Sequence, residues 1–410
     1  MPLLVPQGVH PNARVLVASR AARAFGDGFV SLLLPYYLTR LGYSAFEIGV
    51  IITATLLGSG LMTLATGFLA HRIAADRLLR WACVLMIASG FGVIATTAFW
   101  PLLIVALVGT LNPSAGDVSV FYPLEQTLLA RAAPPAQRTA LFARYSLVGA
   151  LVGAAGAQAA AVPEWLAGQS ALPIMTAIQA MFVLYALLGA LTLFLYRGLR
   201  MPADTTATTP TPLGPSRRVV YKLAALFSLD AFAGGFAVQS LLALWLFQRF
   251  ELSVATTGSI FLVAGVLAAF SFPVAAWLAR RIGLVNTMVF THLPANVFLI
   301  LVPFMPTLGW ALFFLLLRFA LSSMDVPARS SYVMAVVTPP ERPAAASLTA
   351  VPRSLASAVS PLFAGALLSA SPFGWPLVLC GALKIAYDVA LLYQFRHVRP
   401  PEESAARVEA

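Results

Sequence analysis

Ionisable residues recur at helical spacing inside long apolar stretches of the sequence. Arg20, Arg23 and Asp27 follow one another at intervals of three and four residues and continue to Ser31, which places all four on one face of a helix. Charged groups in such surroundings lose their hydration, so they usually bind a proton, a charged solute or one another. The pattern therefore predicts a polar stripe that reaches into an apolar layer.

A second stripe also has helical spacing, at intervals of four, three and four residues, and consists of Arg318, Ser322, Asp325 and Arg329. Arg318 and Arg329 could hold an anionic solute, or they could hold acids in the closed states of the protein. Asp325 and Arg329 are four residues apart and could instead neutralise one another within the helix. Both interpretations remain open from the sequence.

Asp27 and Glu125 are the candidate proton-binding residues. Asp27 lies between Gly26 and Gly28, where the absent side chains would leave room for water or substrate. Burial raises the pKa of a carboxyl group and a nearby cation lowers it, so an acid between these influences can bind and release protons. The further candidates for solute binding or gating are Arg23, Asp117, Asp230, Arg318, Asp325 and Arg329.

Other charged or unusual residues in the apolar stretches have structural interpretations. Lys384 and Asp388 are four residues apart and predict a pair within one helix. Arg20 lies about two turns inside its stretch, so its long stem would let the guanidinium reach lipid headgroups. Pro123 predicts a kink. His292 has no His or Cys nearby and the cysteines are far apart, so we expect no metal site, no cofactor and no disulfide.

The composition indicates which elements must position these residues. Of the 410 residues, 60% are hydrophobic and 10% are charged, whereas a soluble domain carries about a quarter charged residues. Apolar runs of about 20 residues can cross the hydrocarbon layer as helices and are too long for the strands of a membrane barrel. We predict twelve transmembrane helices over 14–39, 45–70, 77–99, 101–131, 139–161, 172–197, 219–248, 254–279, 285–304, 309–337, 342–370 and 374–396.

The basic residues in the loops and at the ends of these spans predict the orientation. Seventeen lie on the side of the N-terminus, and only Arg40 and Arg249 lie on the other side. Such an excess is typical of cytoplasmic loops, so both termini are expected in the cytoplasm. It also accounts for the net charge of +11 without a nucleic-acid partner. The N-terminus lacks the pattern of a cleavable signal peptide, and we expect a bacterial inner (plasma) membrane as the location.

The sequence contains an internal duplication. A shift of 209 residues places Ser31 on Ser240, and a shift of 204 places Pro123 on Pro327. Two parallel six-helix halves are a recurrent transporter architecture. We predict an N-terminal six-helix bundle over 1–197, a cytoplasmic linker over 198–218, a C-terminal six-helix bundle over 219–397 and a cytoplasmic tail over 398–410.

The loop after the second predicted helix resembles the signature loop of the major facilitator superfamily, which reads roughly Gly-x-x-x-Asp-Arg-x-Gly-Arg-Arg. Gly67 and Arg72 fit this pattern, whereas the acidic position holds His71. The equivalent loop of the second half contains Arg280 and Arg281. In the family this loop stabilises the outward-open state, so these five residues are candidates for controlling conformational change. The resemblance also implies that helices 1, 4, 7 and 10 line a central cavity.

The resemblance further implies a secondary transporter that moves a small molecule by alternating access and is not an enzyme. The fifth predicted helix contains Gly149, Gly153 and Gly156, which resembles a glycine pattern of antiporters in the family, although small residues also simply allow close helix packing. We predict proton-coupled export by a monomer surrounded by lipid. The alternatives are a uniporter or proton symporter for an organic anion, a metal-ion exporter, and a membrane sensor that does not transport.

Overall fold

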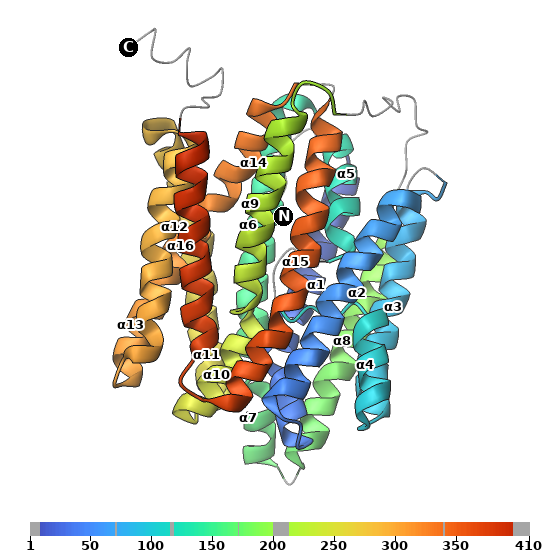
Figure 1. The fold of residues 1–410 in the computed structure, drawn as a ribbon. Coiled ribbons are helices and arrows are strands. Elements are labelled where there is room, and N and C mark those ends of the chain that lie inside the picture. The colour runs from blue at the N-terminus through green and yellow to red at the C-terminus, as the bar shows by residue number, and fades with distance from the viewer. Residues whose placement is uncertain are drawn as a thin grey trace. The chain divides into compact units, whose positions relative to one another are not determined.

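The computed structural model describes residues 9–69, 72–114, 119–170, 172–199, 213–338 and 341–396. In these ranges the chain forms helices joined by loops, and none of the described residues is in a strand (Figure 1). The helices are α1 (Asn12–Arg40), α2 (Ala45–Leu69), α3 (Ala75–Ala95), α4 (Phe99–Val108), α5 (Phe121–Ala132), α6 (Pro135–Ala159), α7 (Val162–Gln169), α8 (Ile174–Tyr196), α9 (Arg217–Gly235), α10 (Gln239–Phe250), α11 (Val254–Ile282), α12 (Leu284–Leu301), a 3-10 turn η1 (Val302–Phe304), α13 (Leu308–Ser322), α14 (Asp325–Val336), α15 (Arg342–Ala370) and α16 (Trp375–Phe395).

Each predicted span corresponds to one helix or to two consecutive helices. Among the described residues, nine helical segments are long and apolar enough to cross a membrane, and α4 and α13 are shorter apolar helices. Many large apolar side chains are exposed on the helices, as a lipid-facing surface requires. The predicted all-α, polytopic fold is confirmed.

Three predicted spans are each divided into two helices: α4 with α5, α9 with α10, and α13 with α14. A division leaves backbone groups without partners in their own helix, and inside a membrane neighbouring protein must satisfy them. The loop after α4 follows this rule, because the carbonyl of Pro113 accepts a hydrogen bond from the backbone N–H of Ser240 at 3.0 Å.

Pro123 does not kink a continuous helix, which corrects the prediction. It is the third residue of α5, where the missing N–H breaks no helical hydrogen bond. Pro327 has the same place in α14, and the two helices begin and end 204 residues apart, at 121 and 325 and at 132 and 336. The shift found in the sequence therefore relates two helices of equal length.

The chain folds into two compact units. The first contains Met1–Ala203 with Val238–Val266, and the second contains Asp204–Ala237 with Leu267–Ala410. In the first unit, α1 packs against α6, α8 and α10, and α3 packs against α8. In the second unit, α9 packs against α15 and α16, and α12 packs against α13, α14 and α16. The units differ from two sequence halves in one respect, since α10 and the start of α11 group with the first unit.

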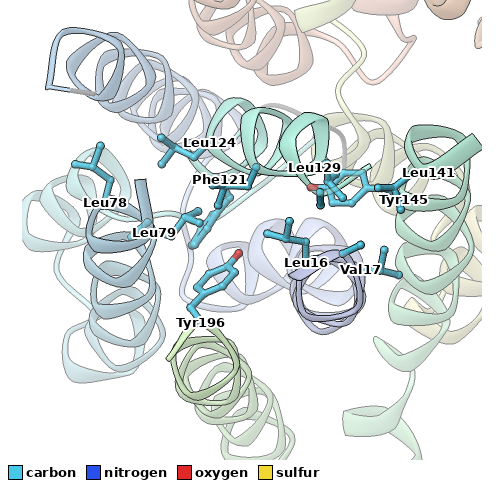
Figure 2. Close-up of a cluster of buried hydrophobic side chains, with 14 of the residues drawn as sticks. Leu16, Val17, Leu78, Leu79, Phe121, Leu124, Leu129, Leu141, Tyr145 and Tyr196 are labelled. Carbon is cyan, nitrogen blue, oxygen red and sulfur yellow. The ribbon is translucent and has the colours of Figure 1, made fainter. Parts of the chain in front are cut away.

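The apolar core of the first unit surrounds aromatic side chains from three helices. Figure 2 shows Phe121 of α5, Tyr145 of α6 and Tyr196 of α8 among leucines of α1, α3, α5 and α6. The hydroxyl of Tyr196 points into this cluster rather than away from it. A buried phenol needs a hydrogen-bond partner, so the core must also contain a polar acceptor.

The first helical turn of α11 is capped by a residue from α7. The Glu164 carboxylate accepts hydrogen bonds from the backbone N–H groups of Val254 and Ala255, each at 3.0 Å. The first N–H groups of a helix have no partner in that helix, and a negative charge there is favourable. Glu164 therefore fixes the start of α11 to α7 within the first unit.

The segment before α15 is tied to the start of α9 in the second unit. The Glu341 carboxylate accepts hydrogen bonds from the backbone N–H of Gly214 and from Thr338 Oγ1, the latter at 2.5 Å. The backbone N–H of Thr338 donates to Ser216 Oγ at 3.4 Å. Hydrogen bonds from Ser216, Thr338 and Gly214 lower the pKa of Glu341 from 4.5 to about 2, because they stabilise the ionised carboxylate.

Candidate functional site

The candidate site consists of two buried charge networks, one within each unit. We call the first the N-terminal network; its members are Arg23, Glu125, Tyr145 and Tyr196. We call the second the C-terminal network; its members are Asp230, His292, Asp325, Arg329, Lys384 and Asp388.

Glu125 is the centre of the N-terminal network. Its carboxylate forms an ion pair with Arg23, and the exposed fractions of the two side chains are 0% and 2%. Tyr196 donates a hydrogen bond to Glu125 Oε1 at 2.6 Å, and Tyr145 donates to Oε2. One buried carboxylate thus has three donors, and the polar acceptor required by the aromatic core is Glu125 itself.

The partners of Glu125 come from three helices that pack around α5. α1 supplies Arg23, α6 supplies Tyr145 and α8 supplies Tyr196. The Arg23 guanidinium also lies over the ring of Phe121, 4.2 Å from its centroid, a cation–π contact that strengthens where water is excluded. A buried ion pair is favourable only when its remaining hydrogen-bonding capacity is satisfied, and the two tyrosines provide this.

Asp27 is also buried, but its surroundings differ from the prediction. Asn112 Nδ2 donates to Asp27 Oδ2 at 3.2 Å. The flanking glycines leave no room for water or substrate: a Cβ on Gly28 would clash with the Gly153 carbonyl oxygen, and one on Gly26 would lie 2.9 Å from the Tyr185 ring. The glycines instead allow α6 and α8 to approach α1 closely.

Arg20 does not reach towards headgroups, which corrects a second expectation. The residue is 5% exposed, and its guanidinium lies 5.4 Å from the centroid of the Tyr145 ring. A Cβ on Gly149 would clash with the Arg20 guanidinium, and one on Gly156 would clash with the Phe25 carbonyl oxygen. These α6 glycines therefore provide the surface on which α1 packs.

Asp230 is the centre of the C-terminal network. Arg329 Nη1 donates to Asp230 Oδ2 at 3.0 Å, and Lys384 Nζ donates to Asp230 Oδ1 at 2.5 Å. Arg329 also lies 3.4 Å from Asp325 Oδ2. The intrahelical pair of Asp325 and Arg329 therefore exists, but Arg329 simultaneously joins α14 to α9.

His292 extends this network to α12 and α16. Its Nδ1 lies 2.9 Å from Asp388 Oδ1 and its Nε2 lies 3.9 Å from Asp230 Oδ1. Asn296 Nδ2 donates to Asp388 Oδ2 at 3.1 Å. The prediction that Lys384 and Asp388 pair within one helix is wrong, because each has its closest partner on another helix. His292 has acidic neighbours that the sequence spacing did not indicate.

Arg318 lies apart from the acids of the second unit. Its guanidinium lies 4.9 Å from the centroid of the Phe319 ring, and its buried Nε has no hydrogen-bond partner among the described residues. No ion pair of Arg318 occurs in the described part of the chain. The candidates Asp117 and His71 lie outside the described residues.

The remaining candidates lie at the ends of α2 and α11. Gly67 is in α2, and a Cβ there would meet nothing within 4 Å. Arg72, Arg280 and Arg281 are exposed. Arg281 lies over the ring of Trp277, 4.7 Å from its centroid, an arrangement typical of an interfacial aromatic and a basic residue.

Sequence reasoning missed the tyrosines and part of the C-terminal network. Tyr145 and Tyr196 gave no periodic signal, because a buried tyrosine looks like any apolar residue until its acceptor is known. His292, Lys384 and Asp388 gave a different signal, because each is an ionisable residue in a predicted span, but their spacing did not indicate their partners. Within the described residues, no group of three or more His, Cys, Asp or Glu side chains could hold a metal ion.

Comparisons with known proteins agree with this fold. Residues 16–324 match the family model of the Major Facilitator Superfamily, and the chain belongs to this family. It is 23% identical to an uncharacterized membrane protein of Saccharomyces cerevisiae, YJR124C, over 94% of each chain. The chain is therefore an integral membrane protein of a transporter family rather than an enzyme.

Solved structures with the same fold come from several transporters. The nucleoside transporter NupG has a TM-score of 0.69 at 13% identity, covering 94% of this chain and 99% of its own. A bacterial homolog of the human lysosomal transporter Spinster has a TM-score of 0.68 at 15% identity, covering 93% and 94%. The human organic anion transporter MFSD10 has a TM-score of 0.63 at 18% identity, covering 93% and 100%.

Proposed function

We propose that this protein is a proton-coupled secondary transporter that exports a small organic molecule by alternating access. The observation that carries the proposal is the burial of Glu125 with Arg23, Tyr145 and Tyr196 as its donors. A membrane protein retains such expensive groups where a charge changes partner during function. Coupling would use this carboxylate as the proton acceptor.

The proposed step follows from the geometry of the ion pair. Ionised Glu125 holds Arg23 and so links α5 to α1. Proton binding to Glu125 would remove the charge that compensates Arg23, leaving a buried cation without its partner, which is costly. The protonated protein would therefore favour a conformation in which Arg23 meets water or another anion. Proton binding and conformation are coupled in this way.

Asp27 is the second proposed proton site. It is buried and lies one turn beyond Arg23 on α1. It accepts a hydrogen bond from Asn112 in the loop after α4, so a change in the charge of Asp27 would alter a contact between α1 and the loop that divides the fourth predicted span.

The direction proposed is export, because the glycine spacing of α6 resembles that of antiporters in the family. Those glycines pack against α1. Flux in vesicles of known orientation tests the direction, and inverted membrane vesicles are expected to accumulate the solute when their lumen is acidic.

Arg318 supports a second candidate function, transport of an organic anion. Its buried Nε has no partner in the described part of the chain, and a buried donor without an acceptor is costly unless a ligand supplies one. An anionic solute would do so. Under this alternative Arg318→Ala abolishes binding of organic acids, whereas Arg318→Lys retains part of it.

The test begins with a thermal-shift screen of the purified protein against organic acids, amino acids, nucleosides and lipophilic cations. Compounds that stabilise it are then used for flux in proteoliposomes, with pyranine inside to report pH. We expect solute movement to change the internal pH, and Asp27→Asn and Glu125→Gln to lose this coupling while solute exchange continues. Glu251→Gln, at an exposed acid, is the matched control. Flux that ignores the pH gradient in the wild type and survives both substitutions would overturn the proposal.

A further inference from the structure

His292 lies between two buried carboxylates that come from different helices. Its Nδ1 lies 2.9 Å from Asp388 Oδ1 on α16, and its Nε2 lies 3.9 Å from Asp230 Oδ1 on α9. The imidazole is 3% exposed, so water does not compete strongly for either nitrogen. Both ring nitrogens therefore face an acceptor, an arrangement that suits the doubly protonated ring.

We assign the first proton of the ring to Nδ1, beside Asp388. Nδ1 lies 2.9 Å from Asp388 Oδ1 and 3.3 Å from the amide nitrogen of Asn296, and of these two partners the carboxylate is the acceptor that suits a protonated Nδ1. The other oxygen of Asp388 is occupied by the amide of Asn296 at 3.1 Å, which holds the carboxylate in place. Nε2 is then the nitrogen at which a proton can be gained or lost.

The second proton would share its acceptor with Lys384. Asp230 Oδ1 accepts from Lys384 Nζ at 2.5 Å and faces His292 Nε2 at 3.9 Å. A proton on Nε2 places a second positive charge beside this oxygen, so it competes with the ammonium for Asp230. When that proton is lost, Asp230 is paired with Lys384 and Arg329 alone.

We propose that His292 is a proton-binding residue whose exchangeable proton sits on Nε2 opposite Asp230, and that its release strengthens the ion pair between Asp230 and Lys384. Only the N–H bond breaks; the proton leaves to solvent and the electron pair stays on Nε2. The use of this step in transport rests on the proposed proton coupling, but the protonation itself does not.

Other charged groups surround this site without replacing either acceptor. Tyr387 packs edge-on to the imidazole, with ring centroids 6.1 Å apart. Arg329 already faces Asp230 and Asp325, and Arg353 is exposed. The titratable and charged groups on neighbouring helices of the second unit include Asp230 on α9, Arg318 on α13, Asp325 and Arg329 on α14, Arg353 on α15, and Lys384, Tyr387 and Asp388 on α16.

The test is 15N NMR of the histidine rings in the full chain, reconstituted in lipid nanodiscs. The sequence has four histidines, and the His292→Gln variant identifies the signal of His292 by its absence. We expect the Nε2 signal to change between the protonated and unprotonated forms as the pH is varied, with Nδ1 protonated throughout. A ring that stays in one neutral tautomer at every pH at which the protein is folded would overturn the proposal.

Substitutions of the partners test the assignment of each proton. Asp230→Asn is expected to weaken proton binding at Nε2 at least about tenfold, one unit on the pH scale. Lys384→Met is expected to strengthen it by a similar factor, because the competing cation is gone, and this variant serves if Asp230→Asn does not fold. Asp76→Asn, at an acid that pairs with Arg80 on α3, should change nothing. A titration that neither Asp230→Asn nor Lys384→Met shifts contradicts the proposal.

Flux measurements separate this inference from the proposed function. If Nε2 titrates as stated while transport ignores the pH gradient, the proton site stands and proton coupling fails. If transport is coupled through Asp27 and Glu125 while the ring does not titrate, His292 is a structural residue and only the present inference fails.

Discussion

Ser240 Oγ donates a hydrogen bond to the backbone carbonyl of Ser31 at 2.6 Å, and these serines are the two positions that a shift of 209 residues superposes. The same hydroxyl lies 2.8 Å from the Pro113 carbonyl. Gln239 Nε2 donates to Ser31 Oγ at 2.9 Å. Residues related by the duplication therefore touch each other within the first unit, and they join α1, α10 and the loop after α4.

Ser240→Ala should lower the free energy of unfolding by about 1 kcal/mol, because the one hydroxyl proton near the Ser31 and Pro113 carbonyls is lost. The shift of the midpoint in detergent-induced unfolding measures this. Ser259→Ala is the matched control, since that exposed hydroxyl bonds only within its own helix, to the Ala255 carbonyl at 3.1 Å. Equal effects of the two substitutions would show that Ser240 does not join the helices.

Tyr196→Phe should lower the free energy of unfolding by about 1.5–3 kcal/mol, because a hydrogen bond to a buried charged group is lost. The removed hydroxyl is 2.6 Å from Glu125 Oε1. Tyr393→Phe is the matched control, because the Tyr393 side chain is 77% exposed. This variant should be as stable as the wild type. If the two variants unfold alike, Tyr196 does not stabilise the Glu125 carboxylate.

Glu125→Gln should lower the free energy of unfolding by about 3–5 kcal/mol, because Arg23 is left as a buried charge without its counterion. Adding Arg23→Met should restore much of the loss, and a double-mutant cycle gives the coupling energy. Additive effects of the two substitutions would mean that the ion pair contributes nothing to the folded state.

The sequence predicted the helices well and the site only in part. Periodic apolar runs identify spans because lipid requires about 20 apolar residues each, and the predicted boundaries lie close to those of α1, α2 and α16. The sequence did not show that three of the spans are each divided into two helices. A division depends on which neighbouring groups satisfy the backbone carbonyls that it frees. The partners of Glu125 and Asp230 come from distant helices, which spacing along one helix cannot reveal.

The glycines of α1 were misread for the same reason. An absent side chain means open space or a close neighbour, and only the packed structure distinguishes these. At Gly28 the neighbour is the backbone of α6, and the Gly153 carbonyl oxygen occupies the place that a Cβ would need.

Gly28→Ala should therefore lower the free energy of unfolding by about 1–3 kcal/mol through overpacking. The backbone of α6 cannot move aside as a flexible side chain can. Gly168→Ala is the matched control, as a Cβ there would meet nothing within 4 Å. Unfolding midpoints of the two variants give the comparison. A Gly28→Ala protein as stable as the control would mean that α1 and α6 can separate without cost.

Glu341→Gln should remove a pH-dependent contribution to stability. The pKa of Glu341 is lowered from 4.5 to about 2 in the folded protein, so the ionised carboxylate stabilises the fold above about pH 4.5 and loses this effect as the pH falls towards 2. The stability difference between wild type and Glu341→Gln should be constant at higher pH and shrink over that interval. A stability difference that is independent of pH would contradict the assignment.

The two networks become complete at different times while the chain is synthesised on the ribosome. Arg23, Glu125 and Tyr145 precede Tyr196, so the first network is complete before the second half of the chain has been made. Asp230 must wait for Arg329, 99 residues later, which takes roughly 5 to 20 s at the usual rate of translation, and for Lys384, 154 residues later. Until Arg329 has been made, the translocon or a chaperone must accommodate an acid that has neither of these countercharges, and the nascent second half is where insertion is most vulnerable.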